Sequence, residues 1–73
     1  MTIFEEHVMP RIELLEYAIE LIPRKINYAM SRNDFARVGK LANDALEFES
    51  RLYKLRALEG APDSVIAWHL ASL

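Results

Sequence analysis

The sequence predicts an all-α fold built on an antiparallel helical hairpin, and three observations support this prediction. No strand-like alternation of apolar and polar residues runs for more than a few residues, while helix-forming residues such as Leu, Ala, Glu and Arg dominate. Two long segments repeat apolar residues at helical spacing. A short polar turn at Asn33-Asp34 separates these two segments. The 73 residues have room for one small domain, so residues 1–73 are interpreted as a single unit.

The first helix is expected over about residues 10–32. Its apolar residues recur at alternating spacings of four and three, which places on one face Val8, Ile12, Leu15, Ile19, Ile22, Ile26 and Ala29. The pattern keeps its phase across Pro23, so we expect a kinked but continuous helix, with a break at Pro23 as the alternative. Residues 1–9 are expected to form an N-terminal arm or a short helix, in which Thr2 and Glu5 match a capping box.

The second helix is expected over about residues 35–59, because Asn33 or Asp34 can cap its start and Gly60 suits its end. It carries a second apolar stripe, formed by Val38, Leu41, Ala45, Phe48, Leu52 and Leu55. Pro62 prevents continuation, and a short third helix is expected over about residues 63–72. Matched lengths and a tight turn make the two long helices an antiparallel hairpin.

Both long helices carry more apolar surface than they can bury in the seam, which is the contact between the two helices. The surplus comprises Leu14, Leu21, Tyr28, Leu46 and Tyr53. A domain of this size needs stabilisation beyond its own small core, and without cysteines it cannot form disulfides. Oligomerisation or binding to a partner is the remaining source of stability. We therefore expect a homodimer, most simply two hairpins in a four-helix bundle, with these five residues in the interface.

The net charge is −2, but the charge is distributed unevenly along the chain, and residues 24–40 carry five bases and one acid. A helix dipole explains bases near the end of the first helix, but not Arg37 and Lys40 near the start of the second. Arginine beside aromatic side chains is the composition of interface hot spots. The expected partner-binding site at the hairpin tip comprises Arg24, Lys25, Tyr28, Arg32, Phe35, Arg37 and Lys40. The competing site is the opposite, acidic end, where the N-terminal arm, Trp68 and Leu73 leave an apolar patch.

The residues of catalytic and metal sites are missing from the sequence. His7 and His69 lie at opposite ends of the chain, and there is no cysteine, Gly-rich phosphate loop or nucleophile elbow. We expect no catalytic residue, no cofactor and no metal. No apolar run approaches the length of a membrane span, and the acidic N-terminus does not match a signal peptide, so we expect a cytoplasmic protein.

The expected function is therefore a small non-catalytic protein-binding regulator, inhibitor or adaptor. It would act as a helical homodimer that occludes the surface of another protein. The alternative is a helix-turn-helix-like nucleic-acid-binding regulator that uses the basic segment 24–40, with Gly39 as one place where a helix could end. The apolar and acidic residues after Gly39 and the net negative charge make nucleic acid the less favoured partner.

Overall fold

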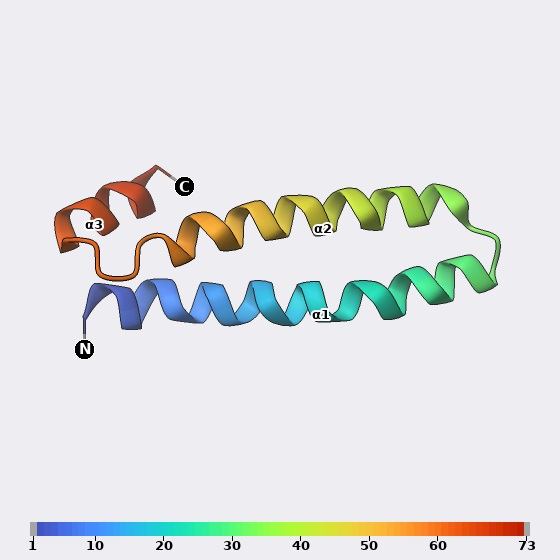
Figure 1. Ribbon diagram of the computed structural model, residues 1–73, viewed down its shortest axis with the longest axis horizontal. Helices are drawn as coiled ribbons and strands as arrows, with labels where there is room; N and C mark the ends of the chain where they lie inside the picture. The colour runs from blue at the N-terminus through green and yellow to red at the C-terminus, as the bar shows by residue number, and fades with distance from the viewer. Residues whose placement is uncertain (1, 73) are drawn as a thin grey trace.

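The computed structural model describes residues 2–72, which form an elongated helical hairpin of 48 × 20 × 15 Å. A π-helical turn, Phe4–Val8, leads into α1 (Met9–Ser31), which is followed by α2 (Phe35–Arg56) and α3 (Asp63–Ala71). Helices α1 and α2 lie side by side and antiparallel, while α3 lies at the end of the hairpin where the chain begins (Figure 1). The prediction of an all-α hairpin with a short C-terminal helix is confirmed.

Helix α1 runs through Pro23 without interruption, so the alternative of a break is wrong. The lost backbone hydrogen bond is offset by packing on both sides of the proline. Ile22 is buried, and Ile26 packs against the same cluster one turn later. Burial of such side chains contributes roughly 2 kcal/mol each, which is enough to keep the helix in register.

Phe4–Val8 form a short π-helix that runs directly into α1. Thr2 Oγ1 accepts a hydrogen bond of 3.1 Å from the Glu5 N–H, as in the predicted capping box. The π-helical turn then continues into α1. Pro10 has no N–H to donate and its ring crowds the carbonyl four residues back, which accounts for the wider turn in front of it. Val8 is fully buried, so this turn belongs to the core.

The tip of the hairpin follows the predicted turn. Asn33 adopts a left-handed backbone conformation with φ of 57°. Asp34 is the cap of α2, because its Oδ1 accepts a hydrogen bond of 3.2 Å from the Arg37 N–H. Asn33 therefore reverses the chain and Asp34 starts the next helix.

Helix α2 ends at Arg56, three residues before the predicted end at 59. The chain continues through turns that are closed by i→i−3 backbone hydrogen bonds, such as the bond from the Leu58 N–H to the Leu55 carbonyl. This tighter winding directs Leu58 into the core, and Gly60 then reverses the chain with φ of 80°. The glycine thus ends the turn and not the helix itself.

All thirteen residues of the two predicted stripes are buried or half-buried, and they form two clusters. The open-end cluster contains Val8, Ile12, Leu52, Leu55, Leu58 and Ile66. The tip cluster contains Ile22, Ala29 and Leu41. Helix α3 is anchored in the open-end cluster by Ile66, which is 2% exposed, while Trp68 is 72% exposed.

Candidate functional site

The hairpin tip holds a concavity of about 390 Å³. Its lining comprises Arg24, Lys25, Tyr28, Ala29, Arg32, Asp34 and Arg37. Five of the seven residues predicted from the sequence thus come together there. Phe35 and Lys40 lie outside this lining, and both are exposed.

The tip concavity has an excess of positive charge, because four basic side chains and the single carboxylate of Asp34 are found among its described lining residues. Within residues 2–72, none of its four basic side chains forms an ion pair with a carboxylate. The guanidinium carbon of Arg32 lies 5.4 Å from the centre of the Tyr28 ring, which is a cation–π distance. The Asp34 carboxylate caps α2. The tip therefore combines unpaired cations with an aromatic surface.

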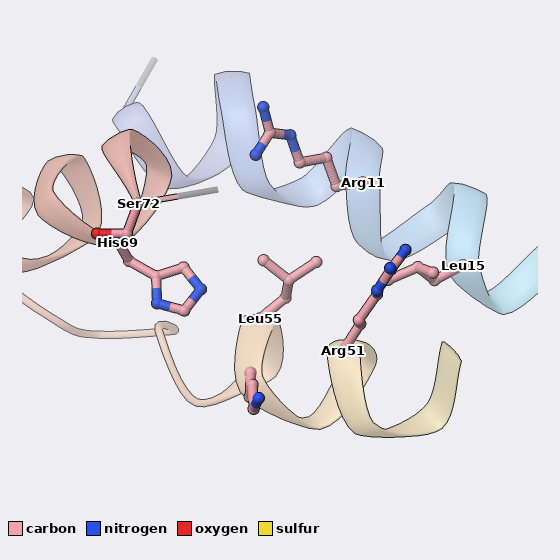
Figure 2. Close-up of a pocket in the computed structure, with 7 residues that line it drawn as sticks. Arg11, Leu15, Arg51, Leu55, His69 and Ser72 are labelled. Atoms are coloured by element: carbon pink, nitrogen blue, oxygen red, sulfur yellow. The ribbon is translucent and has the colours of Figure 1, made fainter. Parts of the chain in front are cut away.

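A second concavity of about 560 Å³ lies at the open end, where α1, α2 and α3 meet. It is lined by Arg11, Leu15, Arg51, Lys54, Leu55, His69 and Ser72. Figure 2 shows Leu55 between the His69 ring of α3 and the arginines of α1 and α2. Charge counted along the chain predicts an acidic end here. The fold instead gathers basic side chains from both long helices around an apolar floor.

Both concavities open on the same side of the hairpin, which we call the basic face. One α1 row at alternating spacings of three and four runs from the open-end concavity to the tip, through Arg11, Leu14, Ala18, Leu21, Lys25, Tyr28 and Arg32. An α2 row with the same spacing joins the same two concavities, through Arg37, Lys40, Asp44, Glu47, Arg51 and Lys54. Seven of the nine lysines and arginines of the chain lie in these two rows.

The other side of the α1–α2 seam, which we call the acidic face, has the opposite character. Its α1 row contains Glu13, Glu16 and Glu20, and its α2 row contains Phe35, Gly39, Ala42, Leu46, Glu49, Tyr53 and Arg56. A concavity of about 330 Å³ marks this side, lined by Ile19, Glu49, Leu52, Tyr53 and Arg56. An ion pair of 3.2 Å between Arg56 and Glu16 joins the two helices there.

The residues predicted for the dimer interface are divided between the two faces. Leu14, Leu21 and Tyr28 belong to the α1 row of the basic face, and Leu46 and Tyr53 belong to the α2 row of the acidic face. All of them are exposed except Leu21, which is half-buried. They do not form one continuous patch on a single chain.

The competing patch at the open end is reduced by packing. Ile3 and Phe4 pack against the open-end cluster, while Val65 and Trp68 of α3 are exposed. Leu73 lies outside the described residues.

Other kinds of site are not found in the described part of the chain. No three His, Asp or Glu side chains among residues 2–72 gather closely enough to hold a metal ion. None of the helices within these residues combines the length and hydropathy needed to cross a membrane. Comparison of the chain with protein-family models, curated proteins and solved structures finds no match.

Proposed function

We propose that this chain is a small non-catalytic regulator, inhibitor or adaptor that binds another protein in the cytoplasm and covers part of its surface. It does so as a self-associated helical bundle, most simply a homodimer. The observation that carries the proposal is the tip concavity, where unpaired basic side chains surround Tyr28.

The composition of the tip favours an acidic partner protein. Arginine and tyrosine are enriched in the energetic centre of protein interfaces, because they combine a large contact area with directional polar groups. Four basic side chains and one capping carboxylate line the concavity, so an acidic surface would be attracted in a salt-dependent way. Phe35, which is 66% exposed beside the turn, adds apolar area that a partner can cover.

Nucleic acid is the less favoured ligand for two reasons. Helix α2 passes through Gly39 without interruption, so the helix end that one version of the helix-turn-helix alternative requires is missing. In addition, Asp44 and Glu47 place two carboxylates in the middle of the α2 row, where a phosphate backbone along the face would be repelled. A protein surface can match both the cations at the ends and the acids between them.

Affinity capture from a lysate of the source organism, followed by mass spectrometry, tests the proposal. We expect one protein to be retained by the wild-type chain and by an Arg11→Glu, Lys54→Glu control at the other end of the basic face. An Arg37→Glu, Lys40→Glu variant of equal charge change should bind this protein roughly tenfold more weakly or worse.

Two outcomes would contradict the proposal. Equal retention by all three proteins, with unchanged salt dependence, would remove the tip as the binding site. Recovery of nucleic acid that is lost only with the tip variant would favour the nucleic-acid alternative.

A further inference from the structure

The two faces of the hairpin are complementary to each other. On the basic face, the α1 row carries four apolar residues and three bases, and the α2 row carries four bases and two acids. On the acidic face, most of the apolar residues lie on α2, where Glu49 and Arg56 interrupt them, and Glu13, Glu16 and Glu20 lie on α1. When a second copy is turned so that its α2 lies over α1 of the first, the apolar residues of these two rows meet, and the glutamates of α1 face the bases of α2.

We infer that this chain self-associates through unlike faces, with the basic face of one copy seated on the acidic face of the next. The inference rests on the self-association part of the proposed function, but it replaces the closed homodimer with a repeating contact. In a stack built from this contact, the tip concavity is open to another protein only on the copy at the end of the stack. In this arrangement Leu14, Leu21 and Tyr28 of one copy pack against Leu46 and Tyr53 of the next. It brings together the five surplus apolar residues that a single chain holds on opposite sides.

Contact between like faces is unfavourable by comparison. A closed dimer places the same patch on both copies. Two basic faces would bring together seven cations and only two carboxylates from each copy. Two acidic faces would bring the Glu13, Glu16 and Glu20 rows of both copies into one interface. Like charges at an interface weaken binding, whereas the unlike contact pairs opposite charges.

The size of the faces allows a stable contact. A face of 48 × 20 Å has a projected area of roughly 1,000 Å², above the approximately 800 Å² that each partner of a stable interface buries. Each copy in an unlike-face pair keeps one face free, so the same contact can repeat. The inferred assembly is therefore an open stack that grows with concentration and does not stop at two copies.

Two single variants test this arrangement by blocking one face each. Leu14→Glu places a charge in the apolar row of the basic face, and Tyr53→Glu does so on the acidic face. Both side chains are strongly exposed in the single chain, at 69% and 77%, so the fold is retained and can be verified by circular dichroism. Ser50→Glu is the matched control, because Ser50 lies on α2 outside both rows.

We expect sedimentation equilibrium of the wild-type chain and of Ser50→Glu to give a mass that rises with concentration beyond twice the monomer mass. Each blocking variant alone should associate at least roughly tenfold more weakly. An equimolar mixture of the two blocking variants should form a species of twice the monomer mass and nothing larger. In that pair, the intact acidic face of one variant meets the intact basic face of the other.

The contrary outcomes separate the inference from the proposed function. If one blocking variant associates as well as the wild type, or the mixture remains monomeric, the contact is not between unlike faces. A wild-type chain that stops at two copies would also overturn the open stack. A wild-type chain that stays monomeric would remove self-association itself, while binding to another protein would still stand.

Discussion

At the scale of single residues, the two glycines of the chain have different roles. Gly39 is a position where the sequence allows a helix to end, but α2 continues through it. A Cβ at Gly39 would meet nothing within 4 Å, so the single chain does not require a glycine there for packing either. Gly60, in contrast, has φ of 80°, a conformation that residues with a side chain rarely adopt.

Alanine substitutions at the two glycines should therefore change stability in opposite directions. Gly39→Ala should raise the free energy of unfolding by about 1 kcal/mol, because alanine costs less backbone entropy in a helix than glycine. Gly60→Ala should lower it by about 1–2 kcal/mol, because a Cβ is strained in the left-handed region. Urea denaturation at a concentration where the chain is monomeric measures both effects. A loss of stability in Gly39→Ala would show that this glycine is needed for packing.

At the scale of secondary-structure elements, Pro23 lies where the local preference of the backbone and tertiary packing oppose each other. Proline disfavours a helix interior, whereas packing on α2 favours a continuous α1. The proline lies inside a helix of 23 residues whose apolar stripe packs on α2 along both halves. The local cost of an interior proline is thus tolerated because breaking the helix would expose one half of the stripe.

Pro23→Ala should stabilise the chain by about 2 kcal/mol. The substitution restores a backbone hydrogen bond and removes a steric clash, which together are worth about 3 kcal/mol. The unfolded chain gains conformational entropy when proline is replaced, and this lowers the net stabilisation. The thermal midpoint and urea midpoint should both increase. A decrease would mean that the local geometry at Pro23 is required for the packing of α1 on α2.

Helix α3 depends on a single deeply buried side chain. Ile66→Ala should lower the free energy of unfolding by about 2–4 kcal/mol, because it removes the anchor of α3 from the open-end cluster. Val65→Ala is the control, because Val65 is 47% exposed and should have a small effect. Hydrogen exchange should show lost protection in α3 and retained protection at the tip. Equal loss at both ends would indicate that the two clusters unfold as one unit.

At the scale of the whole molecule, the separation of charge between the two faces is the dominant feature. The chain is only slightly acidic overall, yet seven of its nine basic residues lie on one side of the seam and the glutamates of α1 lie toward the other. Net charge therefore says little about the partner, because a partner or a second copy meets one face at a time.

Salt dependence reports which faces meet in the assembly. Raising the NaCl concentration from about 0.05 M to about 0.5 M shortens the screening length to less than half. Contact between unlike faces should then weaken by roughly tenfold, because salt screens the attraction between the acidic and basic rows. Sedimentation equilibrium at both salt concentrations measures the change. Stronger association at high salt would point to like faces, whose mutual repulsion is screened.

The helices, the turn and the seam can be predicted from the sequence, whereas the surfaces follow only from the way the helices pack. The 3-4 spacing identifies the residues that face the seam because helical geometry is local, and Asn33 and Asp34 define the turn by their own backbone and capping preferences.

Helix α3 is apolar nearly all around, so its sequence does not show that Ile66 enters the core and Trp68 faces outward. The open-end concavity was missed because Arg11, Lys54 and His69 are distant in sequence and meet only when three helices pack. Charge counted along the chain places the bases at the tip, but the antiparallel packing of α1 on α2 aligns their rows into one basic face.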